Sequence, residues 1–198
     1  MADIDLFRAY REGKPVTAFD LETTGFDPKR DRIVEIGAVK FDRRGLICRY
    51  SVLVNPGIPM PAEAGRVNGI TDAMLAGKPP IGAVLPDFLR LIKDTVIAAH
   101  NAPFDCGFIN ENLAALYRAE GDGGLFGKPD ESWTPPFPVL PNAVADTLVL
   151  ARARFPRAKS HALQELAQSL GIAAGKAHRA EDDAFLCMEL FIRCGEER

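Results

Sequence analysis

The stretch TAFDLETTG (residues 17–25) is an apolar strand pattern that two acids, Asp20 and Glu22, interrupt. Because side chains two residues apart on a strand point to the same face, the two carboxylates are expected to lie side by side. Carboxylates held a few ångströms apart on a buried sheet repel each other, and neither stays ionised without a cation. A hard divalent ion is the natural partner, whereas an edge strand with a solvated acidic face is the structural alternative.

Further strands are expected on both sides of this stretch. The segments 16–21, 33–41 and 46–54 are rich in β-branched residues, and the short gap at 42–45 predicts a hairpin between the second and third. Helices are expected in pieces over 61–91, from Pro103 to about 120, at 147–154, at 162–170 with Ser160 as a cap, and from 179 onward, with short strands at 95–99 and 143–145. This order predicts an α/β fold: a mixed five-stranded sheet, antiparallel and then parallel, flanked by helices.

Length and composition fit a single domain over residues 1–198. The chain is 47% hydrophobic and 26% charged, which is enough for one well-packed core. The catalytic core is expected at about residues 14–194. Residues 121–141 hold four Gly and five Pro, so they are expected to form an irregular excursion rather than a second domain.

Charge and hydropathy limit the partners of the chain. With a formal net charge of −3, no overall positive field would draw it onto nucleic acid, so any such binding must be local. Residues 1–14 do not resemble a secretory signal, no run is long enough to span a membrane, and the four cysteines form no CxxC pair. We therefore expect a cytoplasmic protein that does not bind membranes. The sequence does not determine its oligomeric state.

A third acid, Asp105, lies in the first turn of the helix that Pro103 opens, just after the strand at 95–99. Open α/β sheets bind ligands at strand ends, but an acid in a first helical turn also complements the helix dipole, so both interpretations stay open. Asn101 adds a side-chain amide at the same strand end, able to hold a carboxylate or a phosphate oxygen.

The segment HRAEDDA (residues 178–184) contains two adjacent aspartates that helical periodicity distinguishes. The residues three, four, seven and eleven positions after Asp183 are all apolar, so Asp183 borders a buried face, whereas Asp182 leans toward solvent. His178, at or before the helix start, could reach over the site as a base or remain a surface or capping residue.

Together, three separate segments supply four candidate acids: Asp20, Glu22, Asp105 and Asp183. Oxygen donors without a cysteine cluster favour Mg²⁺ or Mn²⁺ over structural zinc. Pairs of such ions held by carboxylates are a recurring device for phosphoryl hydrolysis.

Three motifs resemble those of the DEDDh 3′–5′ exonucleases, most closely the epsilon-type proofreading exonucleases of DNA polymerase III. They are FDLETTG (19–25), HNAPFD (100–105) and HRAEDDA (178–184), and the segments NGITD (68–72) and DTL (146–148) are also similar. The resemblance runs from about residue 16 to residue 191.

This resemblance implies a ribonuclease-H-like fold and a set of roles at two Mg²⁺ or Mn²⁺ ions. In that scheme Asp20 bridges both ions, Glu22 and Asp183 complete the ion that carries the attacking water, and Asp105 serves the second ion. His178 acts as general base, and hydrolysis of the terminal phosphodiester at a single-stranded or frayed 3′ end of DNA releases a nucleoside 5′-monophosphate.

The resemblance also implies substrate contacts. Phe26 stands where the family inserts an apolar wedge between the last two bases, although an apolar plug at a strand end is the alternative. Glu63 and Asn68 align with positions that touch the terminal nucleotide, where the family more often has histidine in place of Asn68. Thr23 lies beside Glu22, where discrimination of a 2′-hydroxyl would be decided. A local basic run is a candidate for binding backbone phosphates, although such runs are more often a solvated face; its members are Arg152, Arg154, Arg157 and Lys159.

Other functions remain open at this point. An exoribonuclease of the ribonuclease T or oligoribonuclease type would use the same chemistry on RNA. A catalytically silent nucleic-acid-binding scaffold is opposed by the intact set of four acids and one histidine. A DNA polymerase is a candidate partner, but the chain ends at Arg198, shortly after the expected last helix, so no long docking tail is expected and a free-standing repair or turnover enzyme is the other option.

Overall fold

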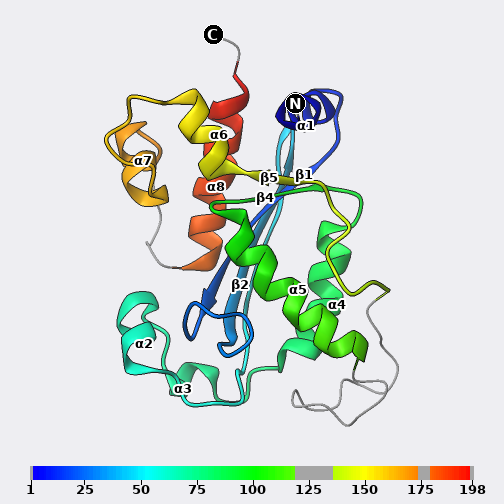
Figure 1. Cartoon of the computed structure of the whole chain (residues 1–198), viewed down its shortest axis with the longest axis vertical. Coiled ribbons are helices and arrows are strands. Elements are labelled where there is room, and N and C mark those ends of the chain that lie inside the picture. The colour runs from blue at the N-terminus through cyan, green and yellow to red at the C-terminus, as the bar shows by residue number, and fades with distance from the viewer. Residues whose placement is uncertain (1, 119–135, 174–178, 197–198) are drawn as a thin grey trace.

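A computed structural model describes residues 2–118, 136–173 and 179–196 (Figure 1). Its sheet has the strand order β3-β2-β1-β4-β5. The strands are β1 (Val16–Thr23), β2 (Ile33–Asp42), β3 (Gly45–Leu53), β4 (Val96–Ala99) and β5 (Val144–Asp146). The pairs β1–β2 and β2–β3 are antiparallel, whereas β4 runs parallel to β1 and β5 parallel to β4. The predicted mixed five-stranded sheet is confirmed.

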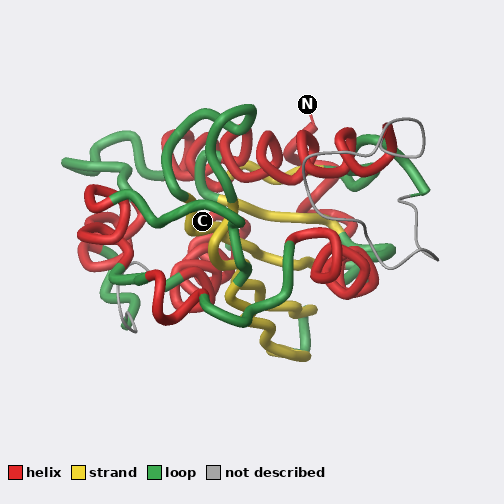
Figure 2. The backbone as a smooth tube through the Cα atoms, turned by 90° about the horizontal axis from the view of Figure 1, so that it is seen from below, coloured by secondary structure: helices red, strands yellow, loops and turns green. Residues whose placement is uncertain are grey.

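Helices cover both faces of this sheet, as Figures 1 and 2 show. In the described residues they are α1 (Ala2–Arg11), α2 (Ala62–Asn68), α3 (Asp72–Leu75), α4 (Ile81–Ile92), α5 (Ala102–Arg118), α6 (Thr147–Arg154), α7 (Leu163–Ser169) and α8 (Ala180–Gly195). One apolar cluster joins the sheet to α4 and α5, and another joins it to α1, α6 and α8. Both clusters are nearly closed to solvent, so the sheet is the middle layer of three.

The two faces of β1 determine where its acids point. Phe19 and Leu21 belong to the cluster under α4 and α5, whereas Val16 and Ala18 belong to the cluster under α8. Because side chains alternate along a strand, Asp20 and Glu22 continue the row of Val16 and Ala18. Both acids therefore lie on the α8 face of the sheet.

Three features differ from the sequence predictions or lie beyond them. Helix α1 was not expected, because its residues mix charges with apolar side chains; Phe7 and Tyr10 stabilise it by packing against Phe191. Ser160 is not the cap of α7: its hydroxyl accepts a hydrogen bond from Ala162 N (3.2 Å), and the helix begins at Leu163. The excursion at 121–141 lies outside the described residues except for 136–141, which form no helix or strand.

Among the described residues, no helix has the length and apolar character needed to cross a lipid bilayer.

Candidate active site

Three of the four predicted acids meet where β1 passes beneath the start of α8. Asp20 and Glu22 come from β1 and Asp183 from the first turn of α8, and one carboxylate oxygen of each lies within 4.8 Å of the other two. Figure 1 shows the β1 arrow ending beside the lower end of α8, where that helix begins. Asp183 lies 163 residues after Asp20 and 161 after Glu22 in the sequence, so the fold alone brings it to them.

The first turn of α8 packs directly on the backbone of β2. A methyl group added at Gly37 would lie 2.0 Å from the carbonyl carbon of Ala180, so only glycine permits this approach. Gly37 is the register partner of Asp20 across β1 and β2. The close contact therefore places the start of α8 beside Asp20.

Asp105 lies beside this group and is held by the backbone of β1. It is 3% exposed, and its Oδ1 accepts a hydrogen bond from Leu21 N at 3.1 Å. Leu21 lies between Asp20 and Glu22, so this bond ties the first turn of α5 to the strand that carries both acids. Asp105 is not one of the three acids whose oxygens form the compact group.

Burial and mutual repulsion raise the pKa of every acid in this region that shows a shift. Burial raises the pKa of Asp20 well above its usual value, and the charges of Asp105, Asp183 and Glu22 add to the effect. Burial, followed by the charge of Asp183, raises the pKa of Glu22 to about 7. The pKa of Asp105 is also raised, chiefly by burial and against the hydrogen bond from Leu21 N. These carboxyls bind protons unusually tightly unless a cation compensates their charge.

Two amide side chains contact the acids of the group. Asn68 is buried at the end of α2, accepts a hydrogen bond from Ile70 N at 3.0 Å and hydrogen-bonds to Glu22, which favours the ionised form of that acid. Gln164, in α7, donates from Nε2 to Oδ1 of Asp183. Gln164 was not predicted from the sequence, because nothing in its local pattern distinguishes it from an ordinary surface glutamine.

A cleft of about 390 Å³ opens beside the acids. Its lining residues are Asp20, His100, Ala162, Leu163, Gln164, Glu165 and Asp183. His100, from the second motif, connects three segments: its Nδ1 lies 3.1 Å from Thr147 Oγ1, and its Nε2 lies 2.8 Å from the carbonyl oxygen of His161. Burial lowers the pKa of His100, and the two contacts of this histidine link α6 to the segment before α7.

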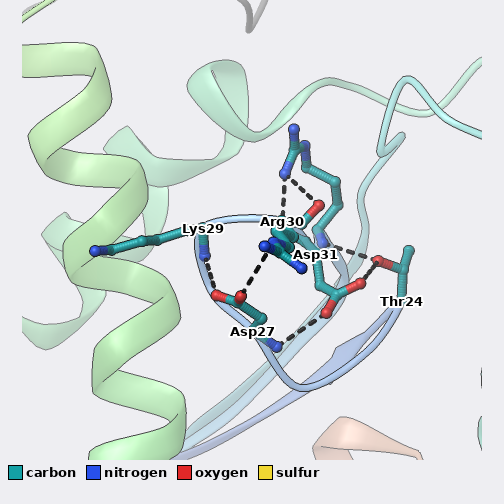
Figure 3. A network of polar contacts seen from close by, with 6 residues as sticks. Thr24, Asp27, Lys29, Arg30 and Asp31 are labelled. Carbon is teal, nitrogen blue, oxygen red and sulfur yellow. Dashed lines mark hydrogen bonds and ion pairs between the residues drawn. The ribbon is translucent and has the colours of Figure 1, made fainter.

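The loop after β1 is closed by its own side chains (Figure 3). Thr24 Oγ1 donates to Asp31 Oδ1 at 3.2 Å and accepts from Arg32 N at 2.9 Å, and Asp27 N donates to Asp31 Oδ2 at 2.9 Å. A methyl group at Gly25 would lie 2.5 Å from the Asp31 carboxylate, so Gly25 is needed for this closure. The result is a compact turn directly beyond the acids.

Phe26 projects from this turn into solvent. It is 89% exposed, and its ring centroid lies 6.4 Å from that of Phe104, which belongs to the second motif. The alternative of an apolar plug is therefore wrong. Thr23, at the end of β1, donates its hydroxyl to the carbonyl oxygen of Gly25 at 2.6 Å.

Two further predicted contacts are exposed, and one predicted residue lies outside the described residues. Glu63 is exposed on α2, and Asn101 is exposed at the end of β4 with a left-handed φ of 68°. Asp146 supports that conformation, because its Oδ1 accepts from Asn101 N at 3.1 Å. His178 lies outside the described residues. In the basic run, Arg154 differs from its exposed neighbours, because it is partly buried and lies over the ring of Phe155.

Comparison with known proteins identifies the family of this site. Residues 17–191 match the model of the RNase_T exonuclease family. The chain belongs to this exonuclease family. It is 43% identical over 185 residues to the DNA polymerase III subunit epsilon of Treponema pallidum, a match that covers 92% of this chain and 77% of that relative.

Two further comparisons extend this assignment. The chain is 38% identical over 172 residues to the PolC-type DNA polymerase III of Clostridium perfringens, and the match covers 87% of this chain but only 10% of that protein. A solved structure of exonuclease X in complex with 5′ overhanging duplex DNA superposes with a TM-score of 0.66 at 23% identity, covering 90% of this chain and 89% of the other. The predicted family, the ribonuclease-H-like fold and an enzyme of the 3′–5′ exonuclease class are confirmed.

In the absence of divalent ions, the fold is expected to lose stability as the pH rises, and more so than a Glu22→Gln variant. The fold shifts the pKa of Glu22 from 4.5 to about 7, so the folded chain holds this proton more tightly than the unfolded chain. The carboxylate therefore destabilises the fold progressively across this pH interval and fully above it. Thermal melting in EDTA measures the difference, and added Mg²⁺ should restore the parent more than the variant.

The exposed acid Glu63 supplies the control for this experiment. Glu63→Gln should follow the parent at every pH. Superimposable pH profiles for the parent and Glu22→Gln would show that Glu22 titrates as an ordinary surface acid, contrary to this account.

Proposed function

We propose that this exonuclease is metal-dependent and hydrolyses the terminal phosphodiester of single-stranded or frayed DNA 3′ ends, releasing nucleoside 5′-monophosphates. The observation that carries the proposal is the meeting of the Asp20, Glu22 and Asp183 oxygens within 4.8 Å. Raised pKa values at Asp20 and Glu22 support it, because they mark a group of acids whose charge needs compensation.

The donor set fits two hard divalent cations. Asp20, Glu22 and Asp183 offer oxygen ligands without sulfur, which favours Mg²⁺ or Mn²⁺. Asp105, held beside them by Leu21 N, would serve the second ion. Held by these residues, such ions would supply a nucleophile at neutral pH and would stabilise the charge on the attacking and leaving oxygens.

The protein itself supplies proton transfer and orientation. We propose His178 as the general base that takes the proton of the attacking water, since an imidazole with a pKa of about 6.5 is largely neutral at pH 7. His178 directly precedes Arg179, the N-cap residue of α8. Gln164 and Asn68 orient the carboxylates of Asp183 and Glu22 through their hydrogen bonds.

The rim of the cleft would hold the end of the substrate. Phe26 presents an exposed ring near Phe104 of the second motif, suited to stacking on a base of any sequence. Thr23, Glu63, Asn68 and Asn101 are proposed contacts to the terminal nucleotide. The exposed residues Arg152, Arg157 and Lys159 could meet phosphates further along the strand.

The names of the related proteins support DNA as the substrate and a DNA polymerase as the partner. The matched proteins are named as DNA polymerase III components, and the superposed exonuclease X is bound to DNA. DNA is therefore the proposed substrate, RNA the alternative, and a DNA polymerase the proposed partner. We further propose that the chain forms a single catalytic domain, because one buried cluster draws residues from Leu6 to Cys194. We also propose that the protein is cytoplasmic.

The predicted activity can be tested on 5′-labelled DNA and RNA oligonucleotides with Mg²⁺ or Mn²⁺. A ladder shortening from the 3′ end is expected, faster on DNA. Asp20→Asn and Asp183→Asn should abolish it because each removes a ligand charge, and His178→Ala should slow it by about 10²–10⁴-fold. Asp182→Asn, at the position beside Asp183, is the control and should retain activity.

Circular dichroism and thermal melting establish that each variant is folded. Full activity in folded Asp20→Asn and Asp183→Asn variants would refute the site. Faster digestion of RNA than of DNA would refute the substrate but leave the chemistry intact.

Phe26→Ala is expected to raise the KM for single-stranded DNA without changing the melting temperature. The ring is 89% exposed and contributes little to the core, whereas stacking on a base is worth about 1–3 kcal/mol, or about 5- to 150-fold in binding. Phe26→Trp keeps an aromatic face and should retain the parent KM. An unchanged KM for Phe26→Ala on both short and long oligonucleotides would exclude the stacking role.

A further inference from the structure

A fifth carboxylate, Glu35, lies beside the acids but, like Asp105, is not one of the three whose oxygens form the compact group. Glu35 is the register partner of Glu22 across β1 and β2, and its side chain is 1% exposed. Its charge contributes to the raised pKa values of Asp20 and Glu22. A buried carboxylate in this place is costly unless other groups bind it.

Most of the groups that bind Glu35 come from the start of α8, and one comes from β3. Arg179 donates from Nη2 to Oε1 at 2.6 Å and from Nε to Oε2 at 3.2 Å, so both oxygens of the carboxylate are engaged. Oε2 also accepts from Ala180 N at 3.3 Å, and Oε1 accepts from Ser51 Oγ at 3.4 Å. A two-point Arg–carboxylate pair fixes direction as well as distance.

This pair determines where Asp183 lies. Arg179 is the N-cap residue of α8, and its carbonyl oxygen accepts the hydrogen bond from Asp183 N at 3.0 Å. Asp183 therefore sits one turn beyond a residue that Glu35 fixes to β2. Because Gly37 has no side chain, the same turn can pack against the same strand.

Stability alone is a weak reason for such a pair. Buried ion pairs can often be replaced by apolar residues without loss, because desolvation offsets their attraction. The Arg179 side chain remains 33% exposed, whereas the Glu35 side chain is closed to solvent. Placement of the helix start explains the arrangement better than stabilisation of the core does.

We propose that Glu35 and Arg179 are positioning residues that hold Asp183 at the metal site, and that Arg179 keeps the Glu35 carboxylate out of the ligand set. The inference rests on the proposed metal-dependent function. Neither residue contacts substrate in this scheme; both act through Asp183.

The test compares two charge-neutral double variants in Mn²⁺ binding and in exonuclease kinetics. Glu35→Gln with Arg179→Met removes the pair without leaving a buried charge. Arg49→Met with Glu181→Gln removes a more exposed pair, Arg49 Nη1 to Glu181 Oε1 at 3.1 Å, which joins β3 to the same first turn of α8. Titration calorimetry measures the Mn²⁺ affinity, and thermal melting reports folding.

The first double variant should fold, bind Mn²⁺ about 10- to 100-fold more weakly and lose kcat with little change in KM, as expected for partners that orient a ligand. Arg179→Lys keeps the charge without the fork and should fall between the two. The Arg49/Glu181 control should match the parent in both measurements, since exposed ion pairs contribute little.

Three results would overturn the inference. They are parent-like Mn²⁺ affinity and kcat in a folded Glu35/Arg179 variant, equal losses in the control, and failure of the Glu35/Arg179 variant to fold, which would make the pair a requirement of the fold itself. A parent that binds no Mn²⁺ would refute the proposed function as well, so the two failures are distinguishable.

Discussion

Mutual repulsion among carboxylates is the constraint around which this structure is organised. Asp20, Glu22 and Asp183 share a volume a few ångströms wide, and Asp105 and Glu35 lie beside it. Polar side chains offset part of that repulsion: the Asn68 amide at Glu22, the Gln164 amide at Asp183 and the Arg179 guanidinium at Glu35. The side chains that contact the acids therefore compensate only part of their negative charge, which favours binding of a cation.

The sequence predicted the sheet and the acids because both depend on local periodicity. Alternation along β1 placed Asp20 and Glu22 on one face, and helical spacing distinguished Asp183 from Asp182; Asp183 is indeed buried, at 8% exposure. The short gap at 42–45 predicted the hairpin of β2 and β3, which the structure confirms. Helix α1 was missed because its stability comes from Phe191, far away in the sequence, rather than from a local pattern.

The polar partners of the acids could not be predicted for a related reason. Gln164 and Arg179 reach their partners across 19 and 144 residues of sequence, and no local spacing encodes those pairings. Glu35 lies within a strongly apolar strand, so the sequence shows that this acid needs a partner. It does not show which residue the partner is. The exposure of Phe26 follows from the closed turn of Thr24, Asp27 and Asp31, which fixes the ring away from the core.

The most direct test of the central claim is the anomalous scattering of Mn²⁺ in crystals of the chain grown with that ion. The account predicts density for the ion among the oxygens of Asp20, Glu22 and Asp183, and none there in an Asp20→Asn crystal. Carboxylates that bind no ion at saturating Mn²⁺, or an ion bound only elsewhere on the molecule, would contradict it.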